Sequence, residues 1–441
     1  MVLRHAVARV RNALSDRPVV LLHGARQTGK TTLVRALART ECPARYVTFD
    51  DLTALSAARR DPAGFLAGFD GPVVFDEVQR VPDLFVAIKA AVDRDREPGR
   101  FLLTGSANAL LVPRPSESLA GRMEIVALWP FSQGEIDGVV EGFVDAAFGE
   151  APPALSAAEA GAVLAGRILR GGFPEAVSSA TAERRRAWFD AYVTTVLGRD
   201  VRDLAAIEGL TELPRLLSLV AARPMALLNY AELARSAGLA QSTLKRYWAL
   251  LEAVFLVRVL RPWHANIGKR MVKSPKVLLC DSGLAAHLMG IDDVRLVQDR
   301  TLFGGLLESF VAMELTKQMD RSTAAPALYH FRTHEGDEVD LVLEHRSGVL
   351  VGIEVKSSAT VTSTDFKGLR VLADAAGRRF HRGVVLYTGR EVVPFGQRLH
   401  AVPIEALWRW HTRPTVGSSR VRRGGHPARA QRRPGADHRR R

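Results

Sequence analysis

The sequence predicts an α/β protein: a parallel sheet with helices on both faces, then a helical region, and then a second, smaller α/β unit. Three observations lead to this prediction. Short apolar runs at 18–23, 73–77 and 100–105 are separated by helical patterns, as in a parallel sheet. The 441 residues suggest about three domains. With 47% hydrophobic and 24% charged residues, the chain can bury cores of ordinary size.

Composition excludes several classes of protein. No run reaches the roughly 18 apolar residues of a membrane span. Arginine and aspartate interrupt the first 17 residues, so no signal peptide is expected. The two cysteines, Cys42 and Cys280, lie far apart in the sequence, which argues against a disulfide framework. We therefore expect a protein without a membrane segment that works in a reducing, cytoplasmic compartment.

The net charge of +14 is unevenly distributed. Residues 413–441 contain ten arginines and one aspartate, so they carry +9 and the rest of the chain only +5. The tail, 412–441, contains almost no large apolar residues and is expected to be disordered. Two interpretations stay open: the arginines add nonspecific affinity for nucleic acid, or the tail is an extension without a role.

The chain begins with a short amphipathic helix at 4–15 and a first strand at 18–23. The strand leads into Gly24–Thr31, which matches G-x-x-x-x-G-K-[ST], and a helical pattern follows at once. The glycines let the backbone curl its N–H groups toward phosphate oxygens, and the helix adds its dipole. Lys30 is expected to reach the β- and γ-phosphates of ATP, and the Thr31 hydroxyl to bind Mg²⁺. The expected nucleotide-binding residues are Gly24, Ala25, Arg26, Gln27, Thr28, Gly29, Lys30, Thr31 and Thr32.

Two carboxylates follow at the end of a later strand. After a strand expected at 45–50 and a helix at 61–69, the apolar run 73–77 ends in Asp76 and Glu77. In a parallel sheet the carboxyl end of this strand faces the phosphate loop. Asp76 is predicted to hold Mg²⁺ through water, and Glu77 to polarise the attacking water as a general base. The alternative is the solvated end of an ordinary strand.

Small polar residues end the strand at 100–105. Thr104, Ser106 and Asn108 are candidates for sensing the γ-phosphate or positioning the water, and an ordinary turn is the alternative. Ser106 therefore joins Lys30 and Glu77 among the predicted catalytic residues.

Arg122 precedes a strand expected at 123–128. Its guanidinium is predicted to stabilise charge in the transition state, either in cis or from a neighbouring subunit. A salt-bridged surface arginine is the alternative. The second possibility implies a homo-oligomer or a partner protein.

Four segments, in this order and spacing, resemble the AAA-type ATPases of the archaeal/STAND-like branch. They are LLHGARQTGKTTL, VVFDEVQRVPDLF, FLLTGSAN and SLAGRMEIVALWPFS. The resemblance implies a P-loop ATPase domain at 1–140 that binds and hydrolyses ATP with Mg²⁺. It also implies that Asp76 and Glu77 are the second nucleotide motif and that Thr104–Ser106 is the sensor strand. It does not settle the role of Arg122.

Residues 141–215 are expected to form a helical connector or lid. The Ala- and Gly-rich stretch 140–165 is interpreted as a linker around Pro152-Pro153, and a long helix is expected at 182–204. A Gly-Gly-Phe-Pro segment before a tyrosine-containing helix and an Arg-Asp pair recurs in the family that the chain resembles. No chemistry is assigned to this region.

The region 216–300 resembles a winged helix. Helix, glycine-containing turn and helix are predicted at 229–252, and strands at 253–259 and 276–280. The predicted second helix and the strands carry many cations, which suits contact with DNA phosphates. The alternatives are a module that docks a protein and a rigid body between domains. The cations are Lys245, Arg246, Arg258, Arg261, Lys269, Arg270, Lys273 and Lys276.

The last folded unit, 301–411, places two carboxylates and a lysine together. Glu354 and Lys356 are two apart on one strand and so share a face, and Asp340 lies on the adjacent hairpin strand. Two carboxylates beside a lysine suit a divalent metal that lowers the pKa of a bound water. The predicted elements are a helix at 302–317, strands at 329–332, 337–344 and 352–358, a helix at 365–375 and a strand at 382–387.

This order of elements resembles the PD-(D/E)XK nuclease fold, in which Glu308 matches the helix-borne acid. The resemblance implies a nuclease site that binds a second Mg²⁺ or a Mn²⁺. Its residues are Glu308, Asp340, Glu354 and Lys356. A structural or vestigial site is the alternative.

Two functions are consistent with these units. In the first, hydrolysis of ATP drives a rearrangement of a DNA-binding, nuclease-like C-terminal half. In the second, the protein is an ATP-driven signalling or scaffold switch, and its nuclease-like domain is not catalytic.

Overall fold

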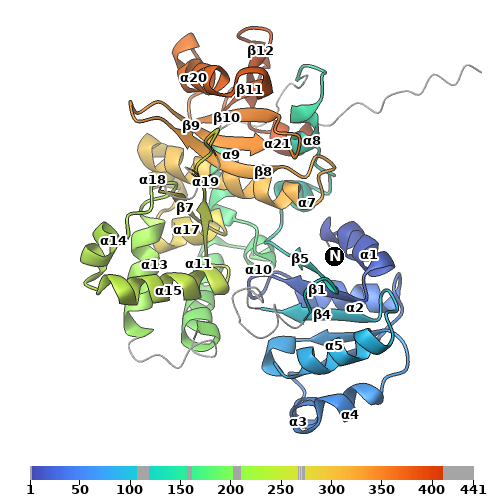
Figure 1. Ribbon diagram of the computed structural model, residues 1–441. Coiled ribbons are helices and arrows are strands. Elements are labelled where there is room, and N and C mark those ends of the chain that lie inside the picture. Colours follow the sequence, from blue (N-terminus) through green and yellow to red (C-terminus); the bar gives the residue numbers. More distant parts are fainter. Residues whose placement is uncertain are drawn as a thin grey trace, which may run out of the picture.

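The computed structural model describes residues 2–106, 119–153, 155, 161–201, 210–266, 268, 270 and 274–410. Figure 1 shows three regions in chain order: a sheet unit in blue, a largely helical region in green and yellow, and a second sheet unit in orange and red. The arginine-rich tail expected to be disordered lies outside the described residues. Within the described ranges, no helix is long and apolar enough to cross a bilayer.

Five parallel strands form the amino-terminal sheet, in the order β2-β3-β4-β1-β5. The predicted parallel sheet is therefore confirmed. Because the strands run in one direction, the carboxyl ends of β1, β3 and β4 meet at one edge. The strands are β1 (Val19–His23), β2 (Arg45–Thr48), β3 (Val73–Asp76), β4 (Phe101–Gly105) and β5 (Met123–Ala127).

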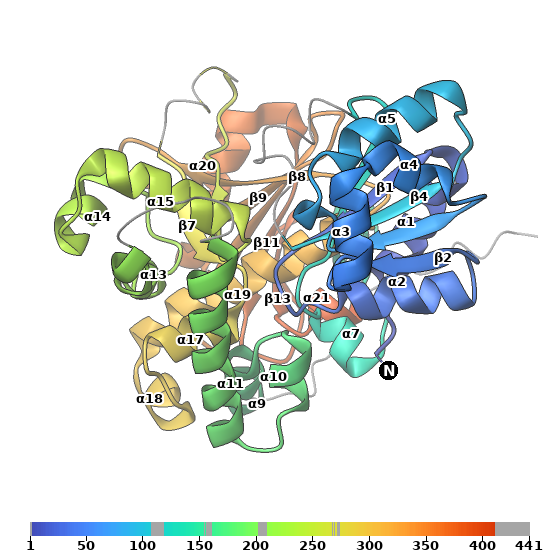
Figure 2. The ribbon, with the colours of Figure 1, turned by 90° about the horizontal axis from the view of Figure 1, so that it is seen from below.

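Helices cover both faces of this sheet. Alternate residues of β1 face opposite sides: Val19 and Leu21 pack with α3–α5, whereas Val20 and Leu22 pack with α1 and α2. Figure 2 shows α5 and α2 on opposite sides of the strands. Two-sided burial explains why the strands are apolar throughout. The helices are α1 (Ala6–Asp16), α2 (Lys30–Arg39), α3 (Leu52–Arg60), α4 (Pro62–Ala67) and α5 (Leu84–Arg94), with the 3-10 turn η1 (Val78–Arg80) after β3.

The middle region is mostly helical, and its buried residues share one core with the C-terminal unit. The stretch 140–165 contains α8 and the start of α9, and Phe143 and Val144 of α8 are buried in that core. The bounds predicted for the linker around Pro152-Pro153 are therefore too wide, because these apolar side chains pack instead of remaining solvated; residues 154 and 156–160 lie outside the described residues. The first elements of this region are α7 (Gln133–Asp137), α8 (Phe143–Phe148), α9 (Gly161–Arg170), α10 (Pro174–Ser178), α11 (Ala182–Thr195), the π-helical turn η2 (Val196–Asp200), η3 (Leu210–Glu212) and α13 (Leu213–Ala221).

The predicted helix–turn–helix and its two strands are present. Gly238 joins the two helices in the left-handed conformation, with φ of 72°. The two strands that follow form an antiparallel pair in which Leu260 lies opposite Lys276. The elements are α14 (Tyr230–Ala237), α15 (Gln241–Ala253), β6 (Val257–Leu260), β7 (Lys276–Leu279), α17 (Ser282–Leu288) and α18 (Asp293–Gln298).

The C-terminal unit is a six-stranded mixed sheet in the order β12-β13-β11-β10-β9-β8. Strands β8, β9 and β10 are antiparallel neighbours, whereas β11 runs parallel to β10 and β13. The long helix α19 packs on one face and α20 on the other. The predicted elements are found, and β12, β13 and α21 were not predicted. The bounds are α19 (Arg300–Met319), β8 (Ala327–Arg332), β9 (Glu338–Glu344), β10 (Leu350–Lys356), η4 (Ser363–Phe366), α20 (Lys367–Ala376), η5 (Gly377–Arg379), β11 (Phe380–Tyr387), β12 (Val393–Pro394), β13 (Leu399–Pro403) and α21 (Ala406–Arg409).

Candidate functional site

The predicted phosphate loop connects the carboxyl end of β1 to the first turn of α2. Gly24 has φ of 154°, and a Cβ built on it would lie 2.2 Å from the carbonyl oxygen of Leu128, so only glycine fits. Gly29 and Gln27 also adopt positive φ, 93° and 62°. These three positions bend the chain sharply enough to return it into α2 within a few residues.

Lys30 lies inside this loop. Its side chain is buried, and its Nζ donates hydrogen bonds to the carbonyl oxygens of Gly24, at 2.9 Å, and Ala25, at 2.8 Å. The hydroxyl of Thr28 also donates to Ala25, at 2.9 Å. Because the loop wraps around the ammonium, Lys30 is placed to reach anionic oxygens held by the loop. Thr32, the last predicted contact, is exposed in the first turn of α2.

Asp76, at the end of β3, is buried and accepts hydrogen bonds from three hydroxyls. Thr31 Oγ1 donates to both carboxylate oxygens, at 3.1 and 2.9 Å, and the Tyr46 hydroxyl donates at 2.6 Å. Thr104 Oγ1 is the third donor. The structure thus brings Thr31 and Asp76, the two residues predicted to hold Mg²⁺, into direct contact. Hydroxyl and carboxylate oxygens are the ligands that Mg²⁺ prefers.

Glu77 follows Asp76 in the left-handed conformation, with φ of 60°. Its backbone N–H donates to Thr104 Oγ1 at 3.0 Å. Gln79 donates from Nε2 to a Glu77 carboxylate oxygen and, at 2.9 Å, to the hydroxyl of Ser106. Glu77, Thr104 and Ser106 are therefore gathered at the edge of the sheet that carries the phosphate loop. Asn108 lies outside the described residues.

Sequence reasoning missed Tyr46 and Gln79. Tyr46 lies on β2, two residues before Thr48. Thr48 in turn lies opposite Asp76 in the neighbouring strand. The only sequence signal for Tyr46 was its place in the strand expected at 45–50. Gln79 acts through the turn after β3, whose geometry the sequence alone does not give.

The position of Arg122 corrects one prediction. Arg122 immediately precedes β5, whose first residue pairs with Val19 at the start of β1. The phosphate loop follows the opposite end of β1, so Arg122 lies at the far edge of the sheet. Its guanidinium instead forms an ion pair with Asp93, with a nitrogen–oxygen distance of 2.5 Å. A catalytic role in cis is therefore wrong, and a role in a neighbouring subunit stays a prediction.

The residues predicted for the nuclease-like site come together in the C-terminal unit. Glu308 lies on α19, Asp340 on β9, and Glu354 and Lys356 on β10. The backbone N–H of Val355 donates to Asp340 Oδ2 at 2.8 Å, and Lys356 Nζ donates to Glu354 at 2.8 Å. Burial and then the charge of Asp340 raise the pKa values of both Glu308 and Glu354. The three carboxylates therefore repel one another in a space with little water.

Lys276, from β7, extends into this acidic cluster. Its side chain is only 4% exposed, and its Nζ lies 2.9 Å from a carboxylate oxygen of Glu338 and 3.8 Å from one of Asp340. Burial lowers the pKa of Lys276, but the charges of Asp340 and Glu338 outweigh this effect and raise it, so the ammonium stays charged. An ammonium thus lies among the carboxylates.

The expectation of a metal at this cluster is not met. Across the described ranges, no three histidine, cysteine, aspartate or glutamate side chains are placed to hold a metal ion together. The physical reason is the arrangement itself: Lys276 Nζ lies 3.8 Å from Asp340 and Lys356 pairs with Glu354, so ammonium groups already face two of the carboxylates that a metal would need.

The predicted DNA-contacting cations differ in their surroundings. Lys245, Arg246 and Arg261 are exposed. Lys276 is buried, and Arg270 makes a two-fold ion pair with Glu344, at 2.5 and 3.0 Å, so neither is available to DNA; this part of the prediction is wrong. Arg258 lies over the ring of Trp129. Lys269 and Lys273 lie outside the described residues.

The end of β1, next to the phosphate loop, contacts the segment that precedes β6. The ring of His23, the last residue of β1, meets the ring of Phe255 edge-to-face at 4.9 Å. Trp129 packs against the same ring at 5.7 Å. Phe255 has φ of 61°, which turns the chain from α15 into β6.

Arg4 makes a second connection. Its guanidinium donates to the carbonyl oxygens of Thr28 in the phosphate loop, at 2.5 Å, and Trp129, at 2.7 Å. Its Nε donates to the Glu135 carboxylate at 3.1 Å. One side chain therefore joins the loop to the segment that leads into α7.

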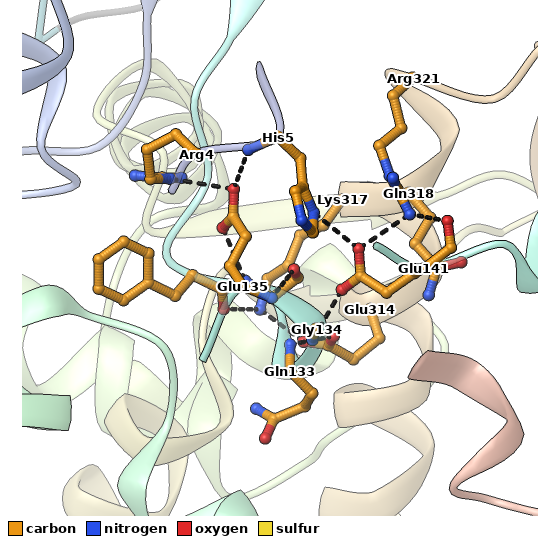
Figure 3. Close-up of polar contacts among 12 residues, drawn as sticks. Arg4, His5, Gln133, Gly134, Glu135, Glu141, Glu314, Lys317, Gln318 and Arg321 are labelled. Atoms are coloured by element: carbon orange, nitrogen blue, oxygen red, sulfur yellow. Dashed lines mark hydrogen bonds and ion pairs between the residues drawn. The ribbon is translucent and has the colours of Figure 1, made fainter. Parts of the chain in front are cut away.

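A buried polar network continues from there to α19 (Figure 3). Glu141 pairs with His5 at 2.9 Å and with Arg321 at 3.0 Å. Burial alone would raise the pKa of Glu141, but hydrogen bonds from His5 and Ser132 and the nearby positive charges lower it to about 2.

Glu314 of α19 lies in the same network and makes the direct contact with the α7 segment. It accepts from the backbone N–H of Gln133 at 2.8 Å and pairs with Lys317 at 2.7 Å. Since α19 also carries Glu308, this network and the acidic cluster share one helix.

Comparison with protein families divides the chain into three matched segments. A family described as "AAA domain" matches residues 16–137, which include the sheet, the phosphate loop, Asp76 and Glu77. Two families described as domains of unknown function, DUF8612 and DUF4143, match 162–295 and 303–407. The first match supports ATP binding and hydrolysis at the level of the family.

Solved structures show only distant likeness to this chain. The Walker-type ATPase PABY2304 of Pyrococcus abyssi is 14% identical, with 65% of this chain and 96% of that chain covered and a TM-score of 0.42. The RuvB Holliday junction branch migration motor of Thermotoga maritima is 18% identical, with 58% and 89% covered and a TM-score of 0.29. At these scores the likeness carries no argument about this chain.

Two mycobacterial proteins are much more similar. They are Uncharacterized protein Rv2008c of Mycobacterium tuberculosis and Uncharacterized protein Mb2031c of Mycobacterium bovis. Each is 37% identical over 409 residues, which cover 92% of this chain and 84% of the relative. The chain therefore belongs to the same protein family as Rv2008c and Mb2031c, with an AAA domain at residues 16–137.

Proposed function

We propose that this protein binds ATP with Mg²⁺ and hydrolyses it. The observation that supports this most is the convergence at one sheet edge of Lys30 inside the phosphate loop, the Thr31–Asp76 contact and Glu77. One small region therefore holds a cation that can bind phosphate, two oxygen ligands for Mg²⁺ and a candidate general base. The AAA match over the same residues points the same way.

Each side chain has a distinct role in this proposal. Lys30 and the loop N–H groups hold the phosphates, and Thr31 and Asp76 hold Mg²⁺, which neutralises charge on the phosphates when bound. Glu77 accepts a proton from the attacking water, and Ser106 orients that water. Arg122 contributes only if a second copy presents it to the site.

We further propose that hydrolysis rearranges the C-terminal half. Two sets of contacts support this: the Phe255 ring on His23, and the path from Arg4 through Glu135 to the buried network on α19. Both begin at the phosphate loop or the strand before it. A change in the loop on nucleotide binding would therefore disturb β6 and α19 together.

The C-terminal half is proposed to be nuclease-like and to contact DNA. The order of α19, three antiparallel strands, α20 and a parallel strand supports the first part, as does the gathering of Glu308, Asp340, Glu354 and Lys356. The helix–turn–helix with its strand pair and the exposed Lys245 and Arg246 support a winged helix that binds phosphates. The alternative proposal is a signalling or scaffold switch, which the pairing of the acidic cluster with Lys276 favours.

The nucleotide proposal is tested with Lys30→Ala. Binding of a fluorescent ATP analogue with Mg²⁺ is measured for the parent, for Lys30→Ala and for Arg39→Ala, which changes an exposed residue at the far end of the same helix. We expect at least a tenfold loss of affinity in Lys30→Ala alone, because the loop loses its buried cation. Equal affinity in all three proteins would remove the central claim.

A further inference from the structure

We propose that the Lys276 ammonium occupies the position of a divalent cation in the acidic cluster, so that this cluster is closed to metal until β7 withdraws. The inference rests on the proposed nuclease-like identity of the C-terminal unit, and its test needs no ATP hydrolysis. Lys276 belongs to the segment matched as DUF8612, whereas Glu338 and Asp340 belong to the segment matched as DUF4143. The side chain that closes the cluster therefore comes from a different matched segment than the carboxylates that it contacts.

Geometry identifies Lys276 as the cation of the cluster. Its Nζ lies 2.9 Å from Glu338 and 3.8 Å from Asp340, and its side chain is almost completely buried. A buried ammonium is stable only where carboxylates surround it, and carboxylates crowded together are stable only where a cation joins them. Lys276 and the cluster therefore satisfy each other, as a metal ion and its ligands would.

A second observation shows that the cluster retains capacity for a ligand. In the part of the chain that the structure describes, the buried Oε2 of Glu354 has no hydrogen-bond partner, although its Oε1 accepts from Lys356. A carboxylate oxygen left without a donor in a buried place is costly, and a bound ion is one of the arrangements that satisfies such an atom. Together with Asp340 and Glu308, it supplies oxygen ligands of the kind that Mg²⁺ and Mn²⁺ prefer.

The way Lys276 is held suggests how the cluster opens. Lys276 is the first residue of β7 and lies opposite Leu260, the last residue of β6. β6 begins two residues after Phe255, whose ring rests on His23 beside the phosphate loop. Backbone hydrogen bonds from the Trp263 N–H to the His330 carbonyl oxygen and from the His330 N–H to the Arg261 carbonyl oxygen join the end of β6 to β8, so withdrawal of the ammonium would also break these contacts.

The test counts bound Mn²⁺ by electron paramagnetic resonance in nucleotide-free protein. We compare the parent, Lys276→Met, and Lys276→Met/Asp340→Asn. Lys276→Met is expected to bind one Mn²⁺ at least tenfold more tightly than the parent, and the Asp340→Asn change is expected to abolish this gain. Arg270→Met is the matched control, since Arg270 joins the same two units through Glu344 and does not contact the cluster.

Several outcomes overturn the inference. The first is Mn²⁺ binding in the parent that depends on Asp340 and is already as tight as in Lys276→Met. The second is a folded Lys276→Met protein that binds Mn²⁺ no more tightly than the parent. The third is an equal gain in Mn²⁺ affinity in Arg270→Met. If Lys276→Met fails to fold, Lys276→Met/Glu338→Gln, which removes both charges of the pair, is read in its place by the same criteria. ATP turnover is measured on the same proteins, so that a failure of this inference can be told apart from a failure of the proposed ATPase activity.

Discussion

Glu77 carries the clearest residue-scale feature of the nucleotide site. A non-glycine residue at φ of 60° is uncommon and costs about 1 kcal/mol or more, so the surrounding contacts must hold it there. The Thr104 hydroxyl accepts its N–H, and Gln79 donates to its carboxylate. These contacts turn the carboxylate toward Ser106, on the side of the sheet where the phosphate loop lies.

Replacing Glu77 tests its role as the base. We expect Glu77→Gln to lower ATP turnover by roughly 10²–10⁴-fold, because the amide cannot accept the proton of the water. Affinity for ATP is expected to stay within a few-fold, since Lys30 and the loop remain. Turnover and binding are measured together, with the exposed Glu97→Gln as control; an unchanged rate in Glu77→Gln would assign the base elsewhere.

His23 makes stability depend on pH. Burial, and then the charge of Lys30, lower its pKa to about 4 from an ordinary value of 6.5. Between these values the unfolded chain binds a proton at His23 and the folded chain does not, so the free energy of unfolding falls as pH falls. The loss is at most about 3 kcal/mol and is complete near pH 4.

The prediction concerns a difference between two proteins. Relative to the parent, His23→Leu should gain stability progressively from pH 7 to pH 4, as measured by urea unfolding at each pH. The exposed His334→Leu is the control for loss of a histidine as such. A stability difference between His23→Leu and the parent that stays constant over this range would contradict the assignment.

At the scale of elements, the β6–β7 pair and α19 connect the two sheet units. The pair begins beside the Phe255 contact with β1 and ends at Lys276 in the acidic cluster. Helix α19 carries Glu314 in the network next to the ATPase unit and Glu308 in the cluster. Both elements therefore reach from the border of the ATPase unit to the acidic cluster.

Phe255→Ala tests the first of these connections. All proteins compared here carry Glu77→Gln. When ATP and Mg²⁺ are added, we expect the hydrogen exchange of residues 257–279 to change where Phe255 is present and to change much less in Phe255→Ala. The reason is that alanine cannot reach the His23 ring. Phe395→Ala, which removes an aromatic contact with Phe366, controls for lost packing. A Phe255→Ala protein that responds to ATP as fully as the Phe395→Ala protein would exclude this route.

Elements with strong local signals were predictable from the sequence. The phosphate loop and the Asp76-Glu77 pair depend on a short motif and on the rule that carboxyl ends of parallel strands share an edge. Asp340, Glu354 and Lys356 depend on period-two spacing in neighbouring strands. In each case the information lies within a few residues or one pairing.

What the sequence could not give depends on distant partners. Lys276 was interpreted as a surface cation because nothing near it reveals that Glu338 lies 2.9 Å away. The in-cis role for Arg122 failed although the signal was available: a residue that begins a parallel strand lies opposite the edge at which the loop binds phosphate. Charged residues are thus the least readable from local pattern, since burial and pairing decide what they do.

At the scale of the whole molecule, the C-terminal half is one body. The helical region, α19 and one face of the second sheet share a single core, whereas the ATPase sheet has its own clusters on its two faces. Polar contacts on α19 and the ring of Phe255 join these two bodies. Because Ala25 of the phosphate loop and Trp129 also pack against the larger core, a movement between the two bodies would break these apolar contacts as well.

Cleavage of DNA tests the function of the whole chain. Plasmid and linear DNA are incubated with Mg²⁺ or Mn²⁺, with and without ATP. We expect cleavage that requires ATP, because the cluster must first lose Lys276, and that disappears in Asp340→Ala and Lys356→Ala. Arg270→Ala serves as the control for the interface. ATP turnover without any cleavage would instead support the switch.

The pair between Lys276 and Glu338 also constrains inheritance. A chain that exchanged its C-terminal unit for one without Glu338 and Asp340 would bury an ammonium without a counterion, which destabilises a protein by about 3–5 kcal/mol. The reverse exchange would leave the carboxylates uncompensated. The segments matched as two separate families are therefore expected to pass between genomes together, and a recombination point between them would be selected against.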